Sequence, residues 1–220
     1  MAEPTGIVAF DLDGTLLPDT TVCLHLAPWV GHDGMAELER QYAEGRITNA
    51  EVAERDAIFY KGRRRHDVCR QLENLEFIDG LPETIKWLKG RSLVPVIATI
   101  TWRLAAEFVR DRFGFAAASG CEIEQTDDGI IQGVVSRHFD AANKVGFVQD
   151  IAAGLGLSLQ NVVAIGDSTS DIPLFRAAGL AIALNASDNA REVADLEFET
   201  RDLRDLIPAI DRYFSTAPLS

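Results

Sequence analysis

The sequence has few cysteines and no long apolar run. Its three cysteines, Cys23, Cys69 and Cys121, are too few and too widely spaced for a disulfide framework or a thiolate metal site. They are typical of a protein in a reducing compartment. No apolar stretch approaches the roughly 18 residues of a membrane-spanning helix, and the first ten residues lack a signal-peptide pattern. We therefore expect a cytoplasmic protein with no membrane partner.

Basic residues are also scarce. The chain has 21 Lys and Arg against 34 Asp and Glu, which gives a formal net charge of −13. Such a charge repels the phosphate backbone of nucleic acids and the anionic face of a membrane. We therefore expect no nucleic-acid partner. The composition leaves open whether the protein is a monomer or a homodimer.

The length and the overall composition are those of a globular protein. With 220 residues, of which 47% are hydrophobic and 25% charged, the chain fits one domain or one and a half. A chain of this length buries roughly 70% of the surface of its unfolded form, enough for a core without disulfides or a structural metal.

Short apolar runs alternate with segments of helical period along most of the chain. This alternation favours a parallel sheet with helices on both faces. The predicted fold class is therefore α/β, a three-layer Rossmann-like core with a mostly parallel central sheet. The expected strands are Gly6–Phe10, Val94–Thr99, Val162–Gly166 and Leu180–Leu184, and the expected helices include Arg103–Phe113, Ala141–Leu155, Ile172–Ala178 and Asp202–Phe214.

A different pattern follows the first strand. Between Leu17 and Phe77, helical-period segments occur without a candidate strand between them. We interpret residues 17–77 as a small helical cap domain inserted after the first strand. Residues 1–16 and 78–220 would then form the α/β core, including a hairpin around Asp128-Gly129.

Chemically active side chains follow the predicted strands. Asp11 and Asp13 follow the first strand, Thr99 ends the second, and Asp167 follows the strand that ends at Gly166. In an open parallel sheet, ligands bind beyond the carboxyl ends of the strands. We therefore expect these groups to meet at one edge of the sheet, with Lys144 from the preceding helix.

Such a group of carboxylates needs a counter-charge. Two unit charges about 4 Å apart repel by roughly 4 kcal/mol at an effective dielectric constant near 20. Because only oxygen ligands are available, Mg²⁺ is the expected cation, with phosphate oxygens completing its shell. Lys144, Thr99 and main-chain N–H groups near Gly14 and Ile100 would bind the phosphate. This pattern favours phosphoryl transfer.

Four motifs in order along the chain resemble the haloacid dehalogenase superfamily of phosphohydrolases, in particular its phosphoserine phosphatase branch. The resemblance covers nearly the whole chain. The motifs are Asp11-Leu12-Asp13-Gly14-Thr15, then Thr99, then Lys144, and finally Gly166-Asp167-Ser168-Thr169-Ser170-Asp171.

The resemblance implies a role for each motif residue. Asp11 would be the nucleophile that becomes an aspartyl-phosphate, and Asp13 would act first as an acid and then as a base. Mg²⁺ would be bound by the Asp11 carboxylate, the Asp13 main-chain carbonyl and Asp167. Asp171 would support that shell or orient Lys144.

The resemblance also indicates where specificity is determined. Phosphoserine phosphatases carry a Glu for the substrate amine at the position that aligns with Thr20, and an Arg for its carboxylate at Asp56, beside Arg55. Neither residue is present here. Trp102 is the aromatic residue expected to touch the substrate. These differences leave the phosphate chemistry intact and argue against L-phosphoserine.

The expected function is therefore a Mg²⁺-dependent phosphomonoester hydrolase that acts through an aspartyl-phosphate on a small phosphorylated metabolite. Asp13 favours a phosphate ester over a carbon–halogen bond, because the dehalogenases lack this second acid. Two alternatives stay open. One is a phosphotransferase that passes the phosphoryl group to an alcohol, and the other is a non-enzymatic phospho-accepting signalling domain.

Overall fold

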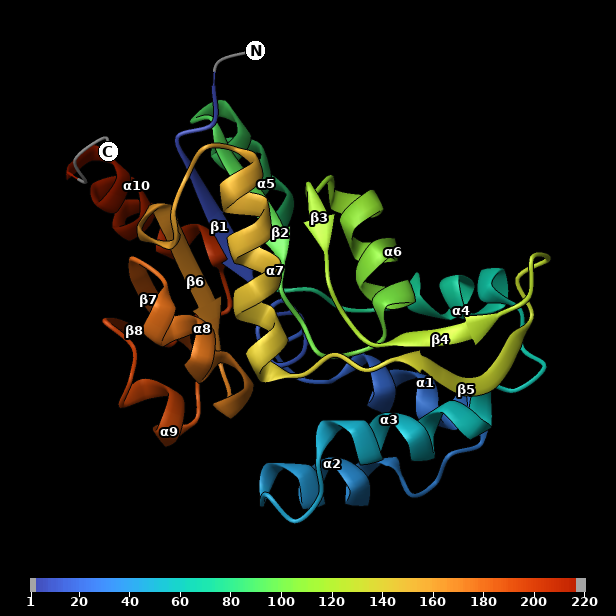
Figure 1. The fold of residues 1–220 in the computed structure, drawn as a ribbon. Coiled ribbons are helices and arrows are strands. Elements are labelled where there is room, and N and C mark those ends of the chain that lie inside the picture. The colour runs from blue at the N-terminus through green and yellow to red at the C-terminus, as the bar shows by residue number, and fades with distance from the viewer. Residues whose placement is uncertain (1–2, 217–220) are drawn as a thin grey trace.

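The centre of the molecule is a six-stranded sheet in the order β3-β2-β1-β6-β7-β8 (Figure 1). The structure is a computed structural model that describes residues 3–216. Every neighbouring pair in this sheet is parallel, which confirms the predicted α/β class. The strands are β1 (Gly6–Phe10), β2 (Leu93–Ile97), β3 (Ala117–Ala118), β6 (Val162–Gly166), β7 (Leu180–Leu184) and β8 (Leu196–Phe198).

Both faces of the sheet are covered by helices. Alternate residues of β1 enter different apolar clusters: Ile7 and Ala9 on one face, Val8 and Phe10 on the other. This double burial explains why the strands read as continuous apolar runs. The first face packs against α7 (Ala141–Gly154), α8 (Ile172–Ala177) and α9 (Asp188–Arg191), and the second against α5 (Leu81–Gly90), α6 (Arg103–Phe113) and α10 (Ile207–Thr216).

Four helices lie between β1 and α5 and form the second body seen in Figure 1. One of them begins at a capping box, in which Thr48 and Glu51 satisfy each other's main-chain N–H groups. The helices are α1 (Val22–Val30), α2 (Met35–Ala43), α3 (Asn49–Ala57) and α4 (Arg65–Leu72), with a 3₁₀ turn at Ile58–Tyr60. The apolar faces of α1, α3 and α4 join the core cluster that contains Phe10, whereas Met35 and Leu38 of α2 pack with Ala27 and Val52 in a separate small cluster.

A two-stranded antiparallel hairpin, β4 (Glu122–Gln125) and β5 (Ile131–Arg137), stands apart from the main sheet. The N–H of Ile131 donates to Arg63 at 2.9 Å, and its carbonyl accepts from Gly62 at 2.8 Å. The hairpin, which we expected within the core, is thus attached by its backbone to the inserted helices. Its strand β5 lies along α3 and the 3₁₀ turn at Ile58–Tyr60, away from the central sheet (Figure 1). The boundary at residues 77 and 78 stays a prediction.

Several elements differ from the expected ones. The strands β3 and β8 were not predicted, because two or three residues are too few to show a period. The segment expected as one helix from Asp202 is a 3₁₀ turn, Leu203–Leu206, followed by α10. Among residues 3–216, no helix combines the length and the apolar character needed to cross a bilayer.

The register of the sheet determines what meets at its carboxyl edge. Phe10 pairs with Ile97 in β2 and with Ile165 in β6. The residues that follow these three strands therefore emerge side by side. The strand order also reverses here, since the chain proceeds outward from β1 through β2 and then returns to β6 on its other side. Such a switch point is where open α/β sheets bind ligands.

Gly120 connects this edge of the sheet to the hairpin, and its backbone conformation leaves no room for a side chain. Its φ is +143°, and an added Cβ would lie 2.4 Å from the carbonyl oxygen of Thr101 and 2.8 Å from the nitrogen of Arg103. We expect Gly120→Ala to lower the free energy of unfolding by about 1–3 kcal/mol. Urea denaturation measures this. Gly154→Ala, which meets nothing within 4 Å, is the matched control. Equal effects of the two substitutions would contradict the expectation.

Candidate active site

Asp11 stands at the end of β1 with its side chain in a fixed position. Its N–H donates to the carbonyl of Ile165 in β6 at 2.9 Å, and its Oδ1 accepts from the N–H of Leu12 at 2.7 Å. Its Oδ2 lies 3.0 Å from Nζ of Lys144. Burial, followed by the nearby carboxylate of Asp171, raises the pKa of Asp11 to about 6, although Lys144 opposes this shift.

Lys144 is fully buried in the first turns of α7, a helix that starts at a capping box between Asp140 and Asn143. Its Nζ lies 2.7 Å from Oδ1 of Asp171 and donates to Oγ of Ser170 at 3.1 Å. Burial alone would lower the pKa of Lys144, but the carboxylates of Asp11 and Asp171 more than offset it and raise the pKa above its usual value. The ammonium group therefore stays charged inside the protein.

Both carboxylate oxygens of Asp171 are in use. Oδ1 faces Lys144, and Oδ2 accepts from the main-chain N–H groups of Asp167 and Ser168, both at 3.1 Å. A carboxylate held from both sides in this way fixes the ammonium group and the loop after β6 together. This geometry fits the predicted role of Asp171 in orienting Lys144.

Asp167 approaches the same point from the loop after β6. The hydroxyl of Thr15 donates to its Oδ1 at 2.8 Å. Burial, then the neighbouring Asp171 and Asp11, raise the pKa of Asp167 well above its usual value. Gly14 makes room for this carboxylate: its φ is +77°, and a Cβ there would lie 2.3 Å from Oδ2 of Asp167.

The structure corrects the role expected for Gly14. We expected its N–H to bind a phosphate oxygen, but that N–H donates to the carbonyl of Leu17 at 3.0 Å. Gly14 lines the cavity and admits Asp167, and its N–H is not free for a ligand. Ile100 differs in this respect, because no acceptor for its N–H lies among residues 3–216.

The carboxylates have the composition and spacing of a cation site. One oxygen each from Asp11, Asp167 and Asp171 lie within 4.8 Å of one another. Three carboxylates face a single ammonium group, so the site has an excess of negative charge that a divalent cation would neutralise. Asp11 and Asp167 line the cavity and Asp171 does not, so Asp11 and Asp167 are the side chains that a cation in the cavity would meet. An all-oxygen donor set suits a hard cation.

Asp13 differs from Asp11 in its protonation. Removal from bulk water raises the pKa of Asp13 to about 8, although the N–H of Val22, which donates to Oδ1 at 2.8 Å, partly opposes the shift. At neutral pH the group is therefore mostly protonated. Two carboxyl groups two residues apart thus differ in their protonation at neutral pH.

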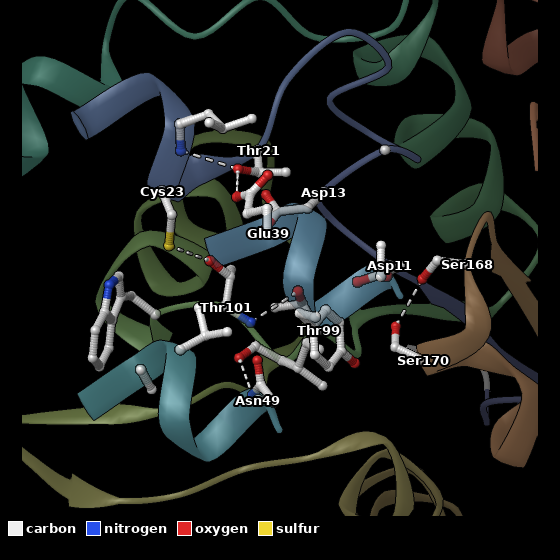
Figure 2. Close-up of a pocket in the computed structure, with 18 of the residues that line it drawn as sticks. Asp11, Asp13, Thr21, Cys23, Glu39, Asn49, Thr99, Thr101, Ser168 and Ser170 are labelled. Atoms are coloured by element: carbon white, nitrogen blue, oxygen red, sulfur yellow. Dashed lines mark hydrogen bonds between the residues drawn. The ribbon is translucent and has the colours of Figure 1, made fainter. Parts of the chain in front are cut away.

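Several of these side chains line a single cavity of about 410 Å³ (Figure 2). Thr99 is fixed at its wall, because its N–H donates to the hydroxyl of Ser119 and its carbonyl accepts from that same hydroxyl, both at 2.9 Å. Asp11, Asp13, Thr99, Ile100 and Asp167 line the cavity, and Lys144 lies behind Asp11. The groups predicted to act together therefore do meet.

The specificity candidates have different locations. Thr20 and Trp102 line the cavity. Asp56 also lines it, but its side chain is fully buried: Oδ1 lies 3.0 Å from Nδ1 of His32, and Oδ2 accepts from Nε1 of Trp102 at 2.7 Å. Arg55 lies outside the cavity and faces solvent, 3.7 Å from Glu51. Our interpretation of Arg55 as a residue that reads the substrate is therefore wrong.

Some residues of the site were missed by the sequence analysis. Thr15 belongs to a motif that was noted, so its bond to Asp167 could have been anticipated. Ser119 and His32 carry no signal in the sequence. Glu39 sits among the charged residues of α2, and only the tertiary structure shows that it lines the cavity.

The buried charge network yields a prediction for stability. Lys144→Met leaves Asp11 and Asp171 facing each other without a cation, and we expect it to lower the free energy of unfolding by about 3–5 kcal/mol at pH 8. The loss should be smaller at pH 5. The pKa of Asp11 is raised above that of the unfolded chain, so protonation as the pH falls relieves the repulsion in the folded state.

Urea denaturation in EDTA at both pH values measures this effect relative to the unaltered protein. Lys86→Met is the control, because Lys86 is exposed on α5. A loss as small as that of the control would show that the network does not stabilise the fold. A large loss that is independent of pH would show that protonation of Asp11 does not relieve the repulsion.

Comparison with known proteins agrees with this geometry. Residues 8–176 match the model of the haloacid dehalogenase-like hydrolase family. The phosphoserine phosphatase of Methanocaldococcus jannaschii is 27% identical over 96% of this chain and 100% of its own length. The phosphoserine phosphatase SerB2 of Mycobacterium tuberculosis is 31% identical over 86% of this chain, which spans only 46% of that longer relative.

A solved structure described as a phospho-aspartyl intermediate analogue of phosphoserine phosphatase superposes on this chain with a TM-score of 0.81. The two are 26% identical, and the match covers 94% of this chain and 100% of the other. The family match spans β1, the inserted helices and the loop that carries Asp167 and Asp171. The chain belongs to the haloacid dehalogenase-like hydrolase family.

Proposed function

We propose that this protein hydrolyses a small phosphate monoester through an aspartyl-phosphate at Asp11, with Mg²⁺ as its cofactor. One observation carries the proposal. A carboxylate held 3.0 Å from a buried ammonium group and a second carboxyl group with a pKa of about 8 line the same cavity. A nucleophile and an acid are thus present side by side at the edge of the sheet.

In the first half of the reaction, an oxygen of Asp11 attacks phosphorus and the bond from phosphorus to the ester oxygen breaks. The leaving oxygen takes the proton of Asp13, so the leaving group departs as an alcohol and not as an alkoxide. Lys144, the hydroxyl of Thr99 and the N–H of Ile100 bind the phosphoryl oxygens. The products of this half are an alcohol and an aspartyl-phosphate.

In the second half, Asp13, now a carboxylate, accepts a proton from water, and that water attacks the phosphorus of the intermediate. The bond between phosphorus and the Asp11 oxygen breaks, which releases inorganic phosphate and restores Asp13 in its protonated form. One residue thus serves as acid and then as base. The same intermediate would serve a phosphotransferase if an alcohol took the place of water.

The cation site fits Mg²⁺ by the chemistry of its donors. The carboxylates of Asp11 and Asp167 and the main-chain carbonyl of Asp13 would hold it. When bound, it supplies positive charge that offsets the repulsion between these carboxylates and the phosphate. Asp171 remains with Lys144 and keeps the ammonium group directed at Asp11.

The first prediction of this proposal concerns the nucleophile. We expect Asp11→Asn to lower the hydrolysis of p-nitrophenyl phosphate by roughly 10³-fold or more, because an amide oxygen cannot form the intermediate. Asp127→Asn, in the exposed turn of the hairpin, is the control and should keep full activity. Activity of Asp11→Asn equal to that of the control would disprove the role of Asp11. Addition of small alcohols, with analysis for new phosphate esters, separates hydrolysis from phosphotransfer.

The second prediction concerns the metal. We expect Mg²⁺ to raise the melting temperature of the protein, since a ligand at 100 times its dissociation constant stabilises by about 2.7 kcal/mol. Asp167→Asn removes a ligand and should abolish both this shift and the hydrolysis. EDTA should abolish hydrolysis, and Mg²⁺ should restore it. If Asp167→Asn showed the same shift as Asp127→Asn, the metal site would lie elsewhere.

A further inference from the structure

The part of the cavity away from Asp11 is built by the inserted helices and is largely apolar. Leu24 of α1, Met35 and Tyr42 of α2, and Val52 and Ala53 of α3 contribute to its wall. No Lys, Arg or His is among the described residues that line the cavity. The buried Lys144 lies behind Asp11, at the phosphate end. Nothing at the helix-lined end can therefore neutralise an anionic group of the substrate.

The charged groups at this end are acidic. Asp56 is held by His32 and Trp102, so neither of these donors is free for a ligand. Asp19 at the mouth of the cavity accepts two bonds from Arg201, both at 2.6 Å, and is thereby neutralised. Glu39 is different. Its Oε1 accepts from the hydroxyl of Thr21, while no donor to Oε2 lies among residues 3–216.

Glu39 lies close to the proton donor. The hydroxyl of Thr21 donates to Glu39, and the N–H of the next residue, Val22, donates to Asp13. Figure 2 shows Glu39, Thr21 and Asp13 together on one side of the cavity. Thr21 and Val22 are consecutive, so the two carboxyl groups that they bind lie near each other. A substrate therefore needs only a short chain of atoms between the ester oxygen that Asp13 protonates and a group bound at Glu39.

We propose that the substrate is the phosphate ester of a short amino alcohol without a carboxylate, whose ammonium group is bound by Glu39. This inference rests on the proposed hydrolase function and names its substrate class. An ammonium group would pair with the free Oε2 of Glu39, and its carbon chain would contact the apolar wall. A carboxylate on the same substrate would face Glu39 and Asp56 with no cation beside it.

Three esters of similar size test the proposal. Phosphoethanolamine carries the ammonium group, propyl phosphate replaces that group by a methyl, and L-phosphoserine adds a carboxylate to phosphoethanolamine. We expect kcat/KM for phosphoethanolamine to exceed that for each of the other two by at least tenfold. The proposal is overturned if kcat/KM for L-phosphoserine or for propyl phosphate equals that for phosphoethanolamine.

Variants of α2 test the residue. Glu39→Gln should lower the ratio of kcat/KM for phosphoethanolamine to that for propyl phosphate by at least tenfold, since the substitution removes the charge and keeps the shape. Glu37→Gln, an exposed residue of the same helix that lies outside the cavity, should leave the ratio unchanged. An unchanged ratio in Glu39→Gln rejects the assignment. If that variant does not fold, the substrate order of the unaltered protein still decides.

Hydrolysis of p-nitrophenyl phosphate separates this inference from the function on which it rests. Turnover of the aryl ester without a preference for the amino alcohol ester rejects the substrate class and retains the hydrolase. No turnover of any ester with Mg²⁺ present rejects both.

Discussion

The site depends on one buried ammonium group between two carboxylates. Lys144 has no solvent around it, and its charge is stable only because Asp11 and Asp171 lie within 3.0 Å. Each of the three groups would be costly to bury alone. Together they join the end of β1, the start of α7 and the loop after β6. The same contact therefore stabilises this edge of the sheet and provides the positive charge that a phosphate would meet.

The remainder of the site follows from where this contact stands. The parallel register brings the residues after β1, β2 and β6 to one edge, where the strand order reverses. The cavity at this edge is lined on its other side by the inserted helices. The hairpin shares main-chain hydrogen bonds with the inserted segment and reaches the sheet edge through Gly120. The inserted helices and the carboxyl edge of the sheet are thus connected, through the hairpin, by a few backbone contacts.

The two ends of the cavity differ in charge, and under our proposals one end carries out catalysis and the other recognises the substrate. The phosphate end has the ammonium group of Lys144 and a place for a cation. The helix-lined end has apolar side chains and the carboxylate of Glu39. The solved phosphoserine phosphatase structure shares the fold of this chain. At the second end, Asp56 is tied to His32 and Trp102, which leaves no basic group for a substrate carboxylate.

The sequence alone determined the parallel α/β class, the inserted helices and the side chains that converge on the cavity, namely Asp11, Asp13, Thr99 and Asp167. Strand periodicity and the residues that follow each strand are local properties. It did not reveal the short edge strands β3 and β8 or the attachment of the hairpin to the inserted helices. It also did not reveal that the N–H of Gly14 donates to the carbonyl of Leu17. Nor did it distinguish Glu39 from the exposed acids of α2. These features depend on contacts between segments far apart in the chain, and only tertiary packing decides which neighbours a side chain or an N–H group meets.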